Sequence, residues 1–162
     1  MKLKVQVVFQ SDDGKTHPAE DILCLERGPL SSGALGLTLA EAKDLLEGLQ
    51  RTVVERQVTN YLEQQSHCPH CGKQRRRKGN HHPIVYRSVF GKLRLPSMRL
   101  FHCPCQPHNT RTFSPLAQLL PERTAPELLY LQTKFASLIS YGLSVKLLQE
   151  VLPLDHTCYK LH

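Results

Sequence analysis

The opening residues of the chain alternate between polar and apolar side chains. The apolar positions of this alternation are Leu3, Val5, Val7 and Phe9. A period of two predicts a half-buried β-strand over residues 2–10. Residues 19–27 predict a second strand, with Ile22 and Cys24 on one of its sides. The glycine, serine and proline residues of the stretch 28–36 predict a loop after this strand pair.

The pattern changes to a helical period at residue 38. The sequence "TLAE" is a capping box, in which the Thr38 hydroxyl and the Glu41 side chain each accept a backbone N–H of the other residue. Apolar side chains then recur at spacings of three and four, at Leu39, Ala42, Leu46, Leu49 and Val53. The pattern predicts a helix from residue 39 to about residue 65, about 40 Å long. It could serve as a packing helix or a dimerising coiled coil, although the heptad is interrupted at Arg56 and Asn60.

Residues 67–113 combine cysteines and histidines with a predicted β-hairpin. The β-prone residues 85–90 lead into Gly91, where a tight turn is expected, and residues 93–101 lead out. Pro96 in the second run requires an edge or bulge position.

Residues 114–162 have a helical texture. Thr124 is a candidate cap for a helix that Gly142 is expected to end, and a short helix is expected over 144–151. A turn at 152–155 and the start of another helix would complete a helix-turn-helix-like segment. The sequence therefore predicts an α+β chain in three parts: residues 1–66 with strands and a long helix, the zinc-ribbon-like residues 67–113, and the helical residues 114–162.

Charge is distributed unevenly along the chain, whose formal net charge is +7. Residues 64–121, called the acid-free block below, contain no Asp or Glu. Their ten basic residues are Lys73, Arg75, Arg76, Arg77, Lys78, Arg87, Lys92, Arg94, Arg99 and Arg111. The rest of the chain has 11 basic and 14 acidic residues. A cationic segment between slightly acidic ones predicts a polyanion-binding module rather than only a solvated basic surface.

The six cysteines are better explained as metal ligands or free thiols than as disulfides. No apolar run approaches the length of a membrane span, and the N-terminus has no secretory-signal pattern. We therefore expect a reducing compartment, with the cytoplasm, in association with the nucleoid, as the location.

Four of the cysteines form a ligand pattern. Cys68 and Cys71 make a Cys-x-x-Cys pair followed by a glycine, and Cys103 and Cys105 make a Cys-x-Cys pair after 31 intervening residues. Two such pairs at the ends of a hairpin are the plan of a structural zinc ribbon with four thiolates. His108 is an alternative ligand in place of Cys103 or Cys105, and four unligated thiols are a third possibility.

The predicted metal site would hold the basic side chains on a rigid platform. The predicted DNA-binding residues are Lys73, Arg75, Arg76, Arg77, Lys78, Arg87, Lys92, Arg94 and Arg99. Contacts to phosphates bind without choosing a sequence, so the helix-turn-helix-like segment is the candidate for reading bases.

The chain resembles the N-terminal part of ISKra-type insertion-sequence transposases. The stretches that carry the resemblance are "LGLTLAEAKDLLEGLQ", "HCPHCGKQRRRKG", "VFGKLRLPSMRLFHCPCQPH" and "TFSPLAQLLPERTAPELLYLQTKFASLISYGLSVKLLQEVLPLD". The resemblance implies binding to the terminal inverted repeats of a mobile element. It also implies that the full-length relative cuts and joins DNA with a carboxylate triad that holds two Mg²⁺.

The sequence departs from that family in one respect: its fourteen acidic residues include no plausible catalytic triad. We expect a non-catalytic DNA-binding portion of a transposase, truncated before the catalytic core, with double-stranded DNA as partner and no membrane. The alternative is a truncated transposase that acts as an inhibitory, dimerising adaptor, with itself or the full-length enzyme as partner. A catalytic zinc enzyme is not expected, because four thiolates leave no position for water.

Overall fold

The structure is a computed structural model that describes residues 1–11, 14–79, 82–105 and 111–154. The described residues fall into two compact units. The first comprises the described parts of Met1–Val53, Val89–Gly91 and Leu131–His162, and the second comprises those of Val54–Ser88 and Lys92–Tyr130. The division of the sequence into three parts at residues 66 and 113 stays a prediction.

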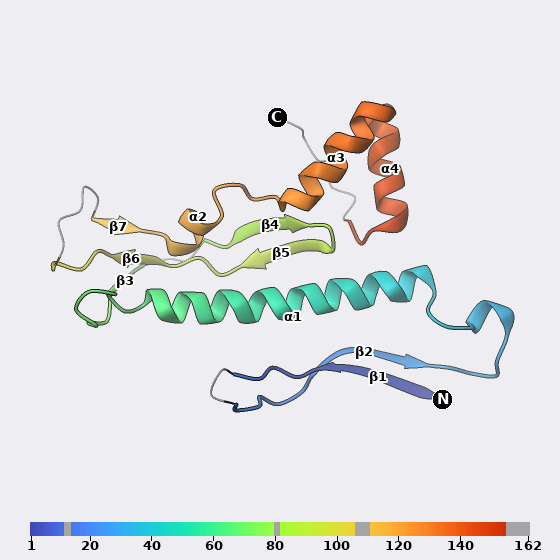
Figure 1. Cartoon of the computed structure of the whole chain (residues 1–162), viewed down its shortest axis with the longest axis horizontal. Coiled ribbons are helices and arrows are strands. Elements are labelled where there is room, and N and C mark those ends of the chain that lie inside the picture. Colours follow the sequence, from blue (N-terminus) through green and yellow to red (C-terminus); the bar gives the residue numbers. More distant parts are fainter. Residues whose placement is uncertain (12–13, 80–81, 106–110, 155–162) are drawn as a thin grey trace. The chain divides into compact units, whose positions relative to one another are not determined.

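The described elements form the α+β fold that the sequence predicts (Figure 1). The strands are β1 (Lys2–Val7), β2 (Glu20–Glu26), β3 (Arg77–Lys78), β4 (Ile84–Ser88), β5 (Gly91–Leu95), β6 (Arg99–Phe101) and β7 (Thr112–Phe113). The helices are the short 3-10 turn η1 (Ser32–Ala34), α1 (Leu39–Gln65), α2 (Pro115–Leu119), α3 (Pro126–Leu138) and α4 (Tyr141–Val151). The strands pair in three small sheets, of order β1-β2, β3-β6-β7 and β4-β5.

The β1–β2 hairpin is confirmed, but Ile22 and Cys24 do not share one side of its second strand as predicted. Leu3 pairs with Leu25 and Val5 with Leu23, and the register then shifts so that Gln6 pairs with Asp21. This bulge leaves Ile22 without an opposite residue and turns its side chain toward the half-buried side, while Cys24 is exposed. A bulge reverses the alternation of faces, which a period-two pattern cannot anticipate.

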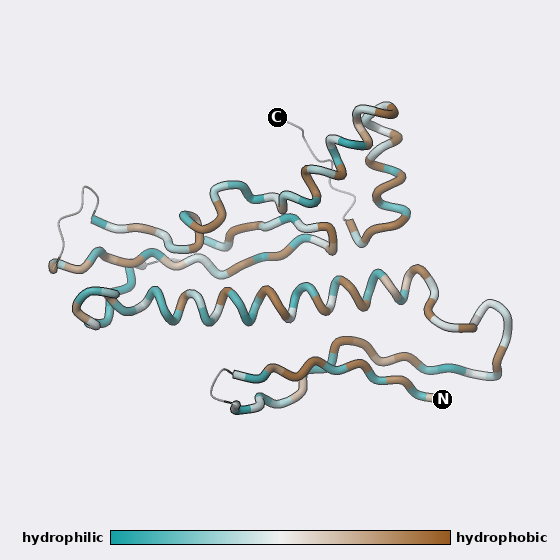
Figure 2. The backbone as a smooth tube through the Cα atoms, viewed as in Figure 1, coloured by the Kyte–Doolittle hydropathy of each residue, from teal (hydrophilic) through white to brown (hydrophobic). Residues whose placement is uncertain are grey.

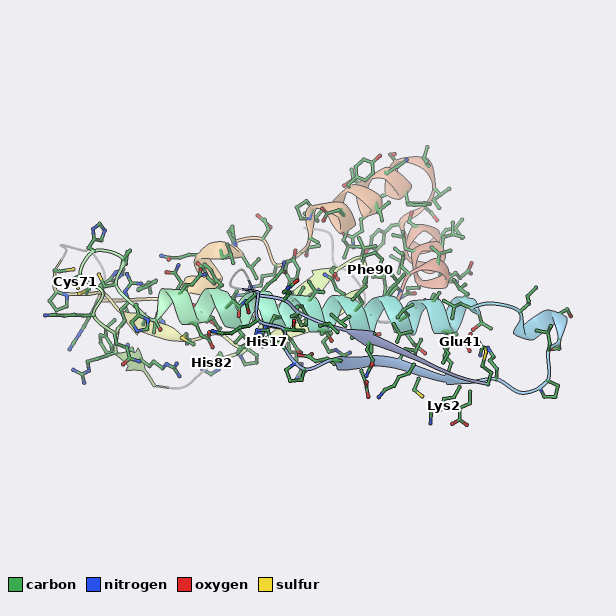
Figure 3. All side chains as sticks on the ribbon, turned by 60° about the horizontal axis from the view of Figure 1, so that its bottom comes forward. Lys2, His17, Glu41, Cys71, His82 and Phe90 are labelled. Carbon is green, nitrogen blue, oxygen red and sulfur yellow. The ribbon has the colours of Figure 1, made fainter. Side chains whose placement is uncertain are left out.

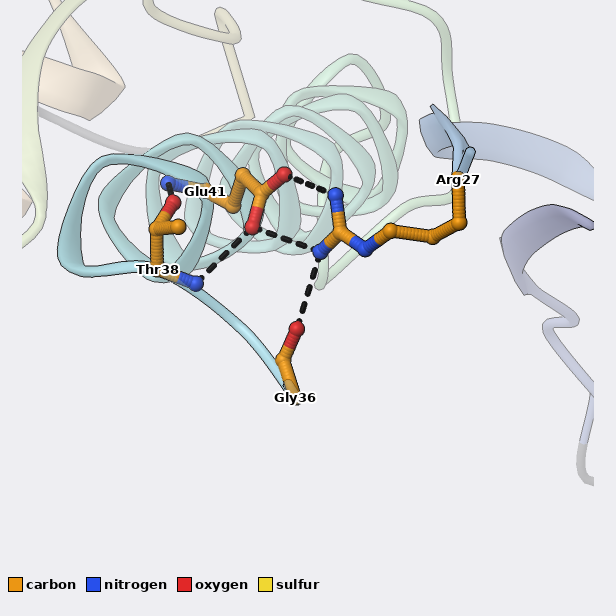
Figure 4. A network of polar contacts seen from close by, with 4 residues as sticks. All are labelled: Arg27, Gly36, Thr38 and Glu41. Atoms are coloured by element: carbon orange, nitrogen blue, oxygen red, sulfur yellow. Dashed lines mark hydrogen bonds and ion pairs between the residues drawn. The ribbon is translucent and has the colours of Figure 1, made fainter. Parts of the chain in front are cut away.

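Helix α1 begins and ends where the sequence predicts. The capping box is formed: the Glu41 N–H donates to Thr38 Oγ1 at 3.3 Å, and the Thr38 N–H donates to the Glu41 carboxylate at 2.8 Å. Arg27 makes a bidentate ion pair with the same carboxylate, with one contact of 2.7 Å, and also donates to the Gly36 carbonyl (Figure 4). Figure 2 shows hydrophobic and hydrophilic positions interleaved along this helix.

Gly48 lets the hairpin approach α1 closely. A Cβ atom at this position would lie 3.0 Å from Ile22 Cγ2 and 3.4 Å from the Ile22 carbonyl oxygen. The bulge residue therefore packs against helix backbone, at a helix position where glycine is otherwise unfavourable by about 1 kcal/mol.

The second unit has the main apolar core. Its buried members come from α1, the β4–β5 hairpin and α2, and they are Val58, Leu62, Ile84, Leu93, Leu95 and Leu116. The Tyr61 hydroxyl at the edge of this cluster donates to the Pro115 carbonyl at 3.4 Å. In the part of the chain that the structure describes, no helix is long and apolar enough to cross a membrane.

The hairpin turn lies two residues earlier than predicted. Val89 and Phe90 form the turn, and Gly91 is the first residue of β5, with a φ of +113°. A side chain there would also meet Glu47 Cγ at 3.2 Å, so glycine is required for both conformation and space. Pro96 follows β5 and lies outside the strands, where its missing N–H disturbs no ladder.

The prediction that Gly142 ends a helix is wrong. Helix α3 ends at Leu138, and α4 begins at Tyr141 with Ser140 as its N-cap, so that Gly142 lies in the first turn of α4 rather than after α3. The Ser144 hydroxyl donates to the Ser140 carbonyl at 3.1 Å, and Ser144 is buried. The second helix expected in the helix-turn-helix-like segment falls on residues outside the described part.

Candidate metal centre and basic groove

The first pair of cysteines sits in a tight loop directly after α1, where Figure 3 labels Cys71. The Cys68 N–H donates to the Lys73 carbonyl and the Gly72 N–H to the Cys68 carbonyl, each at 2.9 Å. Gly72 has a φ of +68°, which permits the reversal. The Arg75 N–H donates to the Ser66 carbonyl at 2.7 Å and closes the loop against the helix end.

The second pair is brought to this loop by the three-stranded sheet. Strand β6 pairs with β3, with Arg77 opposite Leu100, and with β7, with Phe101 opposite Thr112. Beyond the ladder, the Phe101 N–H donates to the Arg76 carbonyl at 2.9 Å. Cys103 and Cys105 follow directly after β6, so the strand pairing fixes where their side chains lie.

The four sulfur atoms of Cys68, Cys71, Cys103 and Cys105 form one cluster. All of them lie within 4.8 Å of one another, and the group could hold a metal ion. Sγ of Cys68 is 3.5 Å from Sγ of Cys105, and Sγ of Cys71 is 3.4 Å from Sγ of Cys103. Cys68 is 2% exposed and Cys103 is 9% exposed, whereas Cys71 and Cys105 are exposed. The alternative ligand His108 lies outside the described residues.

The local backbone favours thiolates at this cluster. Backbone N–H groups of Cys71 and His70 lower the pKa of Cys68 to about 6, and the backbone N–H of Cys105 lowers the pKa of Cys103. The pKa of Cys105 is raised to about 12, because its S–H is shared with the sulfurs of Cys103 and Cys68. Four sulfurs this close cannot all ionise without a cation between them, so the cluster could be completed by a metal ion.

Among the predicted DNA-binding residues, Arg75 has a structural contact. Its guanidinium donates to the Gln65 carbonyl at 3.0 Å and lies 5.0 Å from the centre of the Phe113 ring. It is half-buried and ties the end of α1 to β7.

The other predicted residues differ in exposure. Lys73, Arg76, Arg77, Lys78, Arg94 and Arg99 are exposed, and Arg87 and Lys92 are half-buried. Arg87 is held by its backbone, which donates to the Arg123 carbonyl at 2.9 Å and accepts from the Ala125 N–H at 2.7 Å. Lys78 and Arg99 lie directly opposite each other on β3 and β6. Like charges at opposite positions destabilise a sheet unless an anion lies between them.

A groove of ≈ 390 Å³ lies beside the cysteine cluster. Its lining includes Lys73, Arg76, Phe101, His102, Pro104 and Arg111. The guanidinium carbons of Arg76 and Arg111 lie 5.9 Å and 5.6 Å from the centre of the same ring, that of Phe101. The ring of His102 stacks on Phe113 at 4.5 Å.

Arg111 contributes to the charge of the acid-free block but is not among the predicted DNA-binding residues, and Phe101 is not among the predicted site residues. The two residues come together because β6 pairs with β7, and the His102 N–H donates to the Arg111 carbonyl at 3.2 Å. The only sequence signal was an aromatic residue and an arginine flanking the second cysteine pair.

In comparisons with known proteins, no family model, curated protein or solved structure matches this chain.

Proposed function

We propose that this protein is a zinc-stabilised DNA-binding module, the DNA-binding N-terminal portion of an ISKra-type transposase that recognises transposon ends. The observation that carries the proposal is the gathering of four distant cysteines at one end of a β-ribbon from an acid-free, cationic block.

Zinc is the proposed ion because of ligand chemistry and spacing. With Zn–S bonds of about 2.3 Å, the edges of a regular tetrahedron of sulfurs measure about 3.8 Å. Two sulfur pairs here are 3.4 and 3.5 Å apart, and all four sulfurs lie within 4.8 Å of one another, so shifts of about 1 Å or less in either direction would form the site. Four thiolates close the coordination shell, which assigns the ion a structural role.

DNA is the proposed partner because the cations of the block have no carboxylate in their own segment. Ten basic residues and no acidic ones occupy residues 64–121. The opposed side chains of Lys78 and Arg99 would be relieved by phosphate groups spaced along a backbone. Recognition of the DNA base sequence is assigned to the C-terminal helical segment, of which the structure describes α3 and α4.

The transposase role rests on the sequence resemblance. In that role the module would bind the element's inverted repeats in the cytoplasm, at the nucleoid, while a catalytic core performs DNA cleavage and joining. The chain itself is proposed to be non-catalytic.

Fluorescence anisotropy with duplex DNA tests the proposal across a salt series. If about five of the cations contact phosphates, the logarithm of the affinity should fall against the logarithm of the salt concentration with a slope of about −4.5. Duplexes that carry the element's ends should bind more tightly than scrambled duplexes of equal length. An affinity that does not respond to salt would overturn the DNA-binding function.

A second candidate function is that of a dimerising adaptor. It is favoured by the exposure of Leu39, Leu46 and Leu49 on α1, which are 58%, 38% and 37% exposed at a and d spacings of a heptad. Light scattering over a concentration series tests it. Leu46→Glu should abolish any dimer that this seam forms, and a wild-type monomer at high concentration would exclude the seam.

A further inference from the structure

The groove beside the cysteine cluster has features that diffuse attraction to DNA does not need. Exposed lysines and arginines anywhere on a surface supply nonspecific, salt-sensitive binding. Here, Arg76 and Arg111 come from different strand regions and converge on one aromatic ring. The groove's ≈ 390 Å³ lies in the range of pockets that bind small ligands, about 300–1,000 Å³.

We propose that this groove anchors a single nucleotide unit of a nucleic acid backbone, with one phosphate held by Arg76 and Arg111 and the adjoining sugar against Phe101 and Pro104. This inference rests on the proposed DNA-binding function and deepens it. The proposed groove makes one specific phosphate contact, whereas the other cations contribute only nonspecific electrostatic attraction.

Two guanidinium groups lie near the same ring, and the described residues form no ion pair with either of them. The Phe101 ring lies within 6 Å of both guanidinium carbons, which orients the two planes by cation–π attraction. No carboxylate occurs in residues 64–121 to pair with either arginine. Oriented guanidinium groups bind phosphate oxygens in a bidentate manner, and such charge-assisted bonds are the stronger ones.

The remaining lining residues determine which ligand fits. Lys73, in the stretch after Cys71, adds a further cation, and Arg75, which also lines the groove, is held by the Gln65 carbonyl. Phe101 and Pro104 supply apolar surface next to these charges. A bare inorganic anion would leave this surface uncovered, whereas the sugar next to a phosphodiester would cover it.

The test compares two double variants with equal charge changes in duplex-binding anisotropy at physiological salt. Arg76→Gln with Arg111→Gln alters the groove, and the matched control is Arg77→Gln with Arg94→Gln, on exposed positions of β3 and β5. We expect the groove variant to lose about 100-fold in affinity and the control about fivefold or less. Circular dichroism and the metal content of both variants show whether they remain folded.

A small-ligand titration separates this inference from the proposed function. Dithymidine monophosphate should shift the amide NMR signals of Phe101, His102 and Arg111 in the wild-type chain, and inorganic phosphate should shift them less. If the dinucleotide binds but duplex DNA does not, the inferred nucleotide-binding groove is supported and the proposed DNA-binding function is wrong.

Two outcomes would overturn the inference that the groove anchors a nucleotide unit. If duplex DNA binds and the two double variants lose affinity equally, the cations act diffusely while the DNA-binding function stands. If inorganic phosphate shifts the same signals as strongly as the dinucleotide, the sugar contact is absent and the site is a simple anion site.

Discussion

The N-terminal region (residues 1–53) and the acid-free block (residues 64–121) are stabilised in opposite ways. In the N-terminal region four of the six lysines and arginines have acidic partners: Lys2 with Glu26, Lys4 with Asp21, Arg27 with Glu41 and Arg51 with Glu47. None of its described residues is buried. The acid-free block has fully buried leucines and a sulfur cluster, and no carboxylate in its sequence. The comparison indicates that the paired cations of the first region serve the fold. The second region has seven exposed cations with no carboxylate in their own segment: Lys73, Arg76, Arg77, Lys78, Arg94, Arg99 and Arg111.

The largest expected effect comes from breaking the sulfur cluster. Cys68→Ser with Cys103→Ser should abolish the cooperative unfolding of the β3-β6-β7 sheet, because its short strands depend on the joined cysteine pairs. Thermal circular dichroism and amide exchange of Phe101 measure this. Cys24→Ser is the matched control, since Cys24 is exposed and far along the sequence from the cluster. Unchanged exchange after loss of the cluster would show that the strands need no metal.

A smaller effect is expected from the block's apolar core. Leu95 is 1% exposed, and Leu95→Ala should lower the free energy of unfolding by about 3 kcal/mol through lost burial and the cavity left behind. Leu39 is 58% exposed, and Leu39→Ala should change it by less than about 0.5 kcal/mol. Urea unfolding curves compare the two substitutions. Equal losses would contradict the contrast between a buried core and an N-terminal region without one.

In the N-terminal region, the start of α1 should depend on pH. The ion pair with Arg27, aided by the Thr38 N–H, lowers the pKa of Glu41 from 4.5 to about 2. A carboxylate with a lowered pKa stabilises the fold above its ordinary pKa, and that contribution is lost as the pH falls from 4.5 toward 2. The Thr38 amide signal should follow this loss, and Glu41→Gln should remove the dependence. Thr38→Ala tests the cap itself and should cost about 1 kcal/mol.

The smallest expected effect concerns the opposed cations of β3 and β6. Lys78→Gln removes a like-charge pair with Arg99 and should stabilise the chain by about 0.2–1 kcal/mol. The same substitution should weaken binding to duplex DNA and reduce the magnitude of the salt slope by about 1. Urea unfolding and anisotropy on one sample compare the two effects. A variant that binds DNA as tightly as the wild-type chain would show that this pair does not face phosphate.

Local signals in the sequence predicted the elements that local interactions form. The capping box at Thr38 and Glu41 and the apolar period fixed α1, and the alternation in residues 2–10 identified β1. The spacing of Cys68, Cys71, Cys103 and Cys105 identified the cluster, because two closely spaced cysteine pairs are typical of sites with four cysteine ligands.

The rest depends on interactions between distant residues. Strands β3 and β7 have two residues each, too few to show any period, and they pair only because β6 lies between them. The same pairing brings Arg111 to Phe101, which no local pattern indicates. The bulge at Ile22 likewise follows from packing against Gly48, and the helix start at Tyr141 has no local capping signal, because the Ser140 side chain makes no capping hydrogen bond.

Strand β6 restricts insertions and deletions in the segment that leads to the second cysteine pair. Leu100 is fully buried while Arg99 is exposed, and Cys103 follows three positions after Leu100. A deletion or insertion of one residue between Leu100 and Cys103 would either move the leucine out of its core or carry the cysteine away from the other sulfurs. Any length variation that this protein tolerates must therefore lie outside that interval.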